Sequence, residues 1–368
     1  MYRKLSTKSS TVQNNQLLYL FQVTITNFNI PHPIYACVTT LRCLYQKKFD
    51  PETWKKLIKL ESHCEERKKT ERYEHERIYV ANFIRNFFKL QDEFSEDEIL
   101  KICGIIMVNG HEIPLTSPHH VAIFHLTSML EHSCRPNCYK TFSPQGHVMI
   151  VAGASIKQGD HLSICYTDPL WTTPNRQKHL LETKFFSCTC KRCQDATEFG
   201  TNLSAIRCRK ENCEKGILLP NSFLIQNANW ICKECKTELT TQSVEKILKR
   251  IGEDLQAMKK GNSWACKQFL EYYGKLLTPN HFYLIDVKLA LSQIIGQESK
   301  DGLQQVTDND LNLKIKLCRE INELVEMLAP AEKRLKGALL FELYLAMTEM
   351  NRRTGILADY GDFVSNLM

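Results

Sequence analysis

Apolar residues recur every three to four positions in the first third of the chain, which predicts helices there. Asp50 followed by Pro51 is typical of a helix N-cap and first turn. Ser95 and Glu98 form a capping-box pattern ahead of a later apolar face. Between them, a helix with one apolar side is predicted by Val80, Phe83, Ile84 and Phe87.

The period changes to two between Tyr139 and Tyr166, which predicts a small β region. One strand has Val148, Ile150 and Ala152 on a single side, and another has Leu162, Ile164 and Tyr166. Turn-forming residues at 143–146 precede the first strand, and those at 157–160 separate the two.

Helical spacing returns from Val244 to the end of the chain. Pro330 separates two apolar faces, which predicts a helical hairpin. The faces comprise Leu317, Ile321, Leu324, Val325 and Leu328, then Leu335, Leu339, Leu343, Ala346, Met347 and Met350. The hairpin fits one unit of a tetratricopeptide-like stack and equally an ordinary helical bundle.

Charge and hydropathy exclude two classes of protein. The net charge of +7 over 368 residues is mild, and Lys and Arg are spread through helical stretches, so a basic-tail nucleic-acid binder is not indicated. No apolar run approaches the length of a membrane span. We therefore expect a soluble intracellular protein without membrane association.

Paired cysteines indicate metal binding. Cys208 and Cys213, then Cys232 and Cys235, form two close pairs separated by 18 residues. Tetrahedral zinc requires such a four-thiolate set, whereas the alternative is four unrelated free thiols. The resulting zinc ribbon is expected to be a folding element. Its mixed charges give little support for nucleic-acid binding.

A second set is incomplete in the local sequence. Cys188, Cys190 and Cys193 offer three thiolates, and structural zinc needs a fourth ligand. Spacing alone leaves Cys134, Cys138 and Cys165 as upstream candidates.

Three motifs occur in register around these cysteines: Glu131-His-Ser-Cys-Arg-Pro-Asn137, Gly159-Asp-His-Leu-Ser-Ile-Cys-Tyr166 and Phe186-Ser-Cys-Thr-Cys-Lys-Arg-Cys193. They resemble the second half of a SET domain and its post-SET loop in the SMYD family of protein-lysine methyltransferases, particularly the arthropod-specific branch. The resemblance implies an α+β fold. Its parts are a partial SET β fold with a helical insert, a post-SET zinc loop, a zinc ribbon-like segment and an all-α tetratricopeptide-like C-terminal domain.

The resemblance also implies site residues. Cys134 would join Cys188, Cys190 and Cys193 on one zinc ion, giving two structural zinc sites in all. Tyr166 would be the catalytic tyrosine that shapes the lysine channel, and S-adenosylmethionine would be held by Asn109, Glu131, His132 and Phe186. Each of these residues also has a purely structural alternative. Phe186 could pack in the core, Tyr166 could end a strand with its hydroxyl satisfied locally, and His132 could be a buried structural imidazole.

The chain departs from the family pattern in two places. No Gly-x-Gly occurs before residue 100, and Cys37 and Cys43 are too few for a MYND finger, so the amino-terminal SET portion and that finger are expected to be missing. Glu131 stands where the family has Asn. An ionised Glu carries a negative charge, so it would repel the carboxylate of the methyl donor. It can accept hydrogen bonds but not donate them, so it could still accept from the donor's ammonium.

The expected divisions are a divergent leader at 1–34, the helical insert at 35–120, the second half of the SET core at 121–182, the post-SET loop at 183–197, the ribbon at 204–238 and the C-terminal helices at 239–368. The expected function is S-adenosylmethionine-dependent methylation of a protein substrate in the nucleus and cytoplasm. The alternative is a non-catalytic SET-fold scaffold that binds partner proteins through its C-terminal helices.

Overall fold

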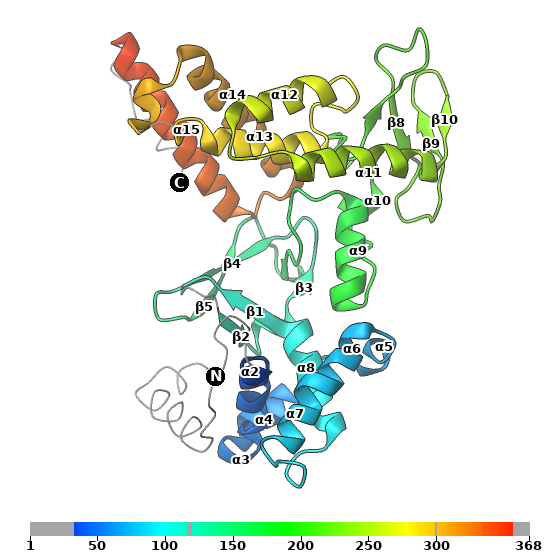
Figure 1. Ribbon diagram of the computed structural model, residues 1–368, viewed down its shortest axis with the longest axis vertical. Helices are drawn as coiled ribbons and strands as arrows, with labels where there is room; N and C mark the ends of the chain where they lie inside the picture. The colour runs from blue at the N-terminus through cyan, green and yellow to red at the C-terminus, as the bar shows by residue number, and fades with distance from the viewer. Residues whose placement is uncertain (1–32, 116–119, 299, 356–368) are drawn as a thin grey trace. The chain divides into compact units, whose positions relative to one another are not determined.

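The computed structural model describes residues 33–115, 120–298 and 300–355, so nearly all of the expected leader lies outside the described residues. The chain divides into two compact units. The first comprises the described part of Met1–Glu131 with Lys140–Val151 and His179–Phe186. The second comprises His132–Tyr139, Ala152–Lys178 and the described part of Ser187–Met368. Figure 1 shows mainly helices and short strands in the first, and a small sheet followed by long helices in the second.

The first unit is built on short helices that surround α8 (Glu96–Asn109). They are α2 (Pro33–Leu44), α3 (Gln46–Phe49), α4 (Pro51–Leu57), α5 (Cys64–Arg67), α6 (Glu71–Glu76), the π-helical turn η2 (Arg77–Ala81) and α7 (Asn82–Asn86). Both predicted caps are confirmed. Asp50 Oδ1 accepts from Thr53 N at 3.1 Å, and Ser95 Oγ accepts from Glu98 N at 3.2 Å. Ile99, Ile102 and Ile105 of α8 are fully buried in the core of this unit.

The helix predicted around Val80 is interrupted, and its apolar face differs from the prediction. Phe87, expected on the buried side, is 46% exposed, while Phe88 is only 5% exposed. Val80 and Ile84 are buried as predicted, but α7 ends at Asn86, so Phe87 and Phe88 lie beyond the helix and the helical spacing no longer decides which of them is buried.

Strands lie between the helices in pairs, of which β1 and β2 are antiparallel. β1 (Gly110–Ile113) pairs with β2 (His120–Ile123), β4 (Cys138–Phe142) with β5 (Val148–Ala152), and β3 (Glu131–His132) with β6 (Ser163–Ile164). A 3-10 turn, η3 (Thr127–Met129), precedes β3. The predicted β region is therefore confirmed, but β6 is shorter than expected. Ile164 is buried, whereas Leu162, predicted to share its side, is 46% exposed because it precedes the strand.

The second unit continues with helices and a small sheet. Its elements are α9 (Thr173–Lys184, whose last turns belong to the first unit), α10 (Lys191–Gln194), β7 (Ile206–Arg207), β8 (Ile217–Pro220), β9 (Trp230–Cys232), β10 (Glu238–Leu239), α11 (Thr241–Ala257), α12 (Ser263–Tyr273), α13 (Phe282–Ile294), η4 (Gly302–Gln305), α14 (Asp308–Leu328) and α15 (Lys333–Thr354). The sheet has the order β10-β9-β8-β7. Helices α14 and α15 meet at Pro330, as the hairpin prediction required.

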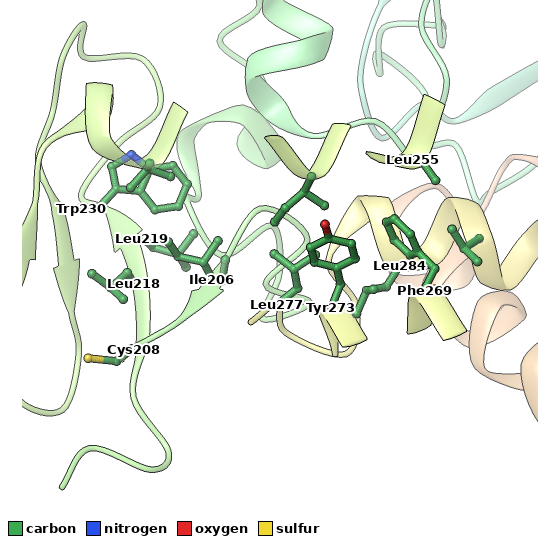
Figure 2. Packing of buried hydrophobic residues seen from close by; sticks show 14 of the residues in the cluster. Ile206, Cys208, Leu218, Leu219, Trp230, Leu255, Phe269, Tyr273, Leu277 and Leu284 are labelled. Atoms are coloured by element: carbon green, nitrogen blue, oxygen red, sulfur yellow. The ribbon is translucent and has the colours of Figure 1, made fainter. Parts of the chain in front are cut away.

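One apolar core joins the small sheet to the helices that follow it. Figure 2 shows Trp230, Leu219 and Ile206 of the sheet in line with Leu277, Tyr273 and Phe269 of the helical part. The bridge between Ile206 and Leu277 supplies a backbone contact in the same place. The sheet with its four cysteines is therefore packed on the helices rather than tethered as a separate finger.

Candidate functional site

Cys134, Cys188, Cys190 and Cys193 lie together, with their sulfur atoms within 4.8 Å of one another. The Sγ of Cys134 is 3.9 Å from that of Cys188 and 3.5 Å from that of Cys193. Zinc–sulfur bonds of about 2.3 Å in a tetrahedron place the sulfurs about 3.7 Å apart. The four thiols therefore have the spacing that zinc requires, and the group could hold a zinc ion.

The structure also distinguishes Cys134 from Cys138 and Cys165, the other two upstream candidates for the fourth ligand. Cys165 Sγ lies 3.1 Å from the carbonyl of Thr167, to which it donates, and Cys138 is buried in β4. Gln177 of α9 fixes the other side of the cluster, since its Oε1 accepts from Cys188 N and its Nε2 donates to Cys188 O. The loop that carries three of the thiols is thereby held beside Cys134.

Arg176, Arg192 and Glu198 are fully buried and form a charged network beside this cluster. Arg176 Nη1 and Arg192 Nε donate to Glu198 Oε2 at 2.7 and 2.8 Å. Arg176 Nη2 also lies 3.7 Å from Cys193 Sγ, and Arg192 Nη1 donates to the carbonyl of Cys134 at 3.2 Å.

The charges of this network suit a zinc–thiolate centre. Two guanidinium groups against one carboxylate leave one surplus positive charge, and buried charges need compensation. Zinc with four thiolates carries two negative charges, which places opposite charges side by side. The pKa of Cys193 is lowered to about 7, first because the Cys134 thiol donates to it, with Arg176 adding to the effect.

Cys208, Cys213, Cys232 and Cys235 form a second group within the same 4.8 Å limit. Cys208 Sγ lies 3.6 Å from Cys235 Sγ, and Cys213 Sγ lies 3.7 Å from Cys232 Sγ. Strands β8 and β9 place the cysteines, because Leu218 pairs directly with Cys232. This group could hold a second zinc ion.

Gly216 lies against the second group of thiols. A Cβ at this position would overlap the sulfurs of Cys213 and Cys232, and the Gly216 carbonyl accepts from Cys208 N at 2.8 Å. The spacing of the cysteines alone gives no sign of this requirement.

Gly216→Ala is expected to weaken zinc binding at the ribbon and to lower stability by about 1–3 kcal/mol, because the added methyl must displace a ligand or the backbone. Competition with a chromophoric chelator and thermal unfolding would measure both effects. Gly261→Ala is the matched control, since a Cβ there meets nothing within 4 Å. Equal zinc affinity in the two variants would contradict the expectation.

His132 links the first thiol group to Tyr166. Its Nδ1 accepts from Tyr166 N at 3.0 Å, and its Nε2 lies 3.2 Å from Cys134 Sγ. Since Nδ1 accepts, a neutral imidazole carries its proton on Nε2 and donates to the sulfur. The two rings lie 5.1 Å apart. Through these two contacts His132 orients the Cys134 sulfur and holds the backbone at Tyr166, just after β6.

Asn137 fixes β6 on the other side of the motif. Its Oδ1 accepts from Ser163 N at 2.9 Å, and its Nδ2 donates to His161 O at 2.8 Å. The cysteine-bearing motif and the strand that leads to Tyr166 are therefore held together by side-chain bonds as well as by β pairing.

The remaining predicted donor-binding residues lie in the first unit. Asn109 is buried, and its Nδ2 donates to the carbonyls of Glu61 at 2.8 Å and Ile105 at 3.0 Å, which leaves Oδ1 for a ligand. Glu131 is exposed at the start of β3, and Phe186 is half-buried. His132 and Tyr166 belong to the second unit.

Comparison with known proteins identifies a SET domain in the chain. The SET domain family matches residues 43–167, which include the Glu131–Asn137 motif and Tyr166. The SET domain-containing protein SmydA-8 (isoform A) of Drosophila melanogaster is 26% identical over 283 residues, 74% of this chain and 59% of that protein. The histone-lysine N-methyltransferase SMYD3 of Mus musculus is 40% identical over 74 residues, 20% of this chain and 17% of that protein.

The chain contains a SET domain and is similar to SMYD-family proteins. The similarity to a Drosophila relative agrees with the expected arthropod branch. The chain spans 59% of the length of SmydA-8 isoform A. Among the described residues, none of its helices is long and apolar enough to cross a membrane.

The sequence analysis did not single out Arg176, Arg192 or Glu198. Arg176 and Glu198 are 22 residues apart, and neither belongs to a cysteine motif. The sequence holds one weak sign of this network. Arg192 lies between Cys190 and Cys193, two of the predicted zinc ligands, where a guanidinium could neutralise thiolates. Its partners are fixed only by the fold.

Proposed function

We propose that the protein is an S-adenosylmethionine-dependent protein-lysine N-methyltransferase. The observation that supports it best is the continuous contact from Cys134 through His132 to Tyr166, within the SET match. SMYD3 and ASHR1 of Arabidopsis thaliana, the latter 30% identical over 146 residues, are named as histone-lysine N-methyltransferases. A histone-type substrate and a role in transcription regulation are part of the proposal.

S-adenosylmethionine, when bound, would supply a methyl group on a positively charged sulfur. In-line displacement needs a neutral lysine amine, alignment and the exclusion of water. The Tyr166 hydroxyl would help to orient the amine, and the His132 hydrogen bond holds the Tyr166 backbone for that role. Cys134, the proposed zinc ligand, would in turn restrain His132.

The candidate donor-binding residues suit a cationic group at the methionine end. With both Nδ2 hydrogens of Asn109 in use, its Oδ1 is an acceptor, and an ionised Glu131 also accepts only. Both suit the ammonium of the donor. Phe186 would supply apolar contact. Glu131 in place of Asn would therefore favour contact with the ammonium over contact with the carboxylate of the donor, and the site would be kept.

Tyr166→Phe is expected to lower kcat for methyl transfer about 10²–10³-fold, the cost of removing one fixed hydroxyl group from such a site. Radiolabelled methyl transfer to a histone mixture would measure it. Tyr139→Phe is the control, since Tyr139 lies in β4 of the same unit. Unchanged turnover in Tyr166→Phe, with donor binding intact, would contradict the assigned role.

Calorimetric titration with S-adenosylmethionine separates the enzyme from the scaffold. We propose that the C-terminal helices α11–α15 form a tetratricopeptide-like domain that binds protein partners in either case. Binding of S-adenosylmethionine with a dissociation constant in the micromolar range would support the enzyme. A folded, zinc-loaded protein without heat at millimolar donor would instead favour a non-catalytic scaffold.

A further inference from the structure

The side chain of Lys184 ends beside a residue assigned to the methyl donor. Lys184 is the last residue of α9, and its Nζ donates to the carbonyl of Val108 at 2.5 Å. Val108 directly precedes Asn109 in the last turn of α8. Because the Val108 carbonyl carbon is bonded to Asn109 N, standard bond lengths place the Lys184 amine no more than about 5 Å from that nitrogen.

The backbone of Lys184 is also close to a second residue of this kind. Phe186 follows two positions later, so its Cα lies no more than about 7.6 Å from that of Lys184. Both residues belong to the first unit, as do Val108 and Asn109. The amine is therefore in the same compact body as two of the predicted donor contacts and close to both.

The loop between α4 and α5 contacts both sides of this arrangement. Glu61 O accepts from Asn109 Nδ2 at 2.8 Å. The ring of His63 lies 5.2 Å from that of Phe185, the residue directly after Lys184. Phe185 has a φ of 59°, in the left-handed region that few residues other than glycine adopt, and strained backbone of this kind often occurs at functional sites. The end of α9 is thus held near the end of α8 by more than one contact.

The Lys184 amine is half-buried and has other basic groups near it. Burial first, and then the charge of Lys140, lower the pKa of Lys184 to about 8. Lys140 of β4 has its Nζ 3.2 Å from Nδ1 of His111 in β1, and Glu112 is the acidic group that acts on Lys140. A methyl acceptor needs a free lone pair, and an amine is half neutral at a pH equal to its pKa. Burial and a neighbouring cation both favour that neutral form.

We propose that Lys184 is a site of self-methylation, at which Nζ accepts a methyl group from S-adenosylmethionine bound to the same chain. The inference rests on the proposed methyltransferase function. The lone pair of the neutral amine forms the N–C bond as the C–S bond of the sulfonium breaks, and the positive charge passes from sulfur to the new methylammonium group. S-adenosylhomocysteine leaves. The methylammonium keeps two N–H groups and can still donate to the Val108 carbonyl.

Peptide mass spectrometry would locate the methyl group. The zinc-loaded full chain would be incubated with S-adenosylmethionine that carries a deuterated methyl group, without any other substrate. We expect the label on Lys184. Lys184→Arg should lose it, and its Tm should stay close to that of the wild type, because Arg keeps a charged donor for the Val108 carbonyl. Lys178→Arg in the same helix is the matched control and should keep the label on Lys184.

The rate of labelling tests whether one chain modifies itself. Transfer within one chain should have a rate constant that does not change over about a tenfold range of protein concentration. A rate constant that rises in proportion to concentration would overturn the assignment to a single chain. If histones take up the label and Lys184 does not, Lys184 only caps α8, so the inference fails and the proposed function stands. If calorimetry shows no binding of S-adenosylmethionine, both fail.

Discussion

Cys134→Ser is expected to remove one zinc ion per chain and to unfold the loop that carries Cys188, Cys190 and Cys193. A structural zinc site contributes about 10–16 kcal/mol of apparent binding free energy, which is comparable with the total stability of a domain. The substitution also breaks the contact to His132, so the end of the strand at Tyr166 loses its anchor. Metal analysis of the purified protein and limited proteolysis around residues 183–197 would measure the two effects.

Cys165→Ser and Cys138→Ser are the matched controls, because both cysteines were candidates by spacing and neither belongs to the thiol group. They should retain two zinc ions. The Cys208 to Cys235 group should keep its metal in all three variants, since it lies in a separate ligand set. A Cys134→Ser protein that still holds two zinc ions would contradict the assignment.

Glu198→Ala is expected to destabilise the second unit by about 3–5 kcal/mol, the cost of leaving buried charge without its partner. Two guanidinium groups, Arg176 and Arg192, would lose their shared carboxylate at positions with no solvent exposure. Thr173 N would also lose the 3.0 Å bond that it donates to Glu198 Oε1 at the start of α9. Urea unfolding followed by circular dichroism would measure the loss.

Glu198→Gln supplies the comparison in the same place, since it keeps an acceptor and the side-chain shape but removes the charge. We expect the free energy of unfolding of Glu198→Gln to lie between those of the wild type and Glu198→Ala. Glu211→Ala, an exposed position in the ribbon, should change stability by less than about 0.5 kcal/mol. Similar unfolding midpoints for Glu198→Ala and Glu211→Ala would show that the buried network contributes little.

Local chemistry explains why some features could be predicted from the sequence. Helix caps at Asp50 and Ser95 depend on residues three positions apart, and the ribbon cysteines form two close pairs. The fourth ligand of the other group required the SET resemblance, because three cysteines satisfied the spacing. The resemblance pointed to Cys134, which the structure brings beside Cys188 and Cys193.

Other features depend on contacts that no local pattern contains. Phe88 is buried and Phe87 is exposed, although the i, i+3, i+4, i+7 pattern favoured Phe87, because α7 ends at Asn86 and both residues lie beyond it. Asn109 was predicted to bind the methyl donor, and in the structure its amide also donates to Ile105 O within α8 and to Glu61 O, 48 residues away. These positions depend on which segments the fold brings together.

The division into two units has a consequence for synthesis of the chain. The boundaries lie at Glu131, Tyr139, Val151, Lys178 and Phe186, so the polypeptide crosses between the units five times. The first unit therefore lacks its last segment, which contains the end of α9, until Phe186 has left the ribosome, although α8 ends at Asn109. Helices made early therefore complete their contacts only with segments made later, and such non-local contacts slow folding of the nascent protein.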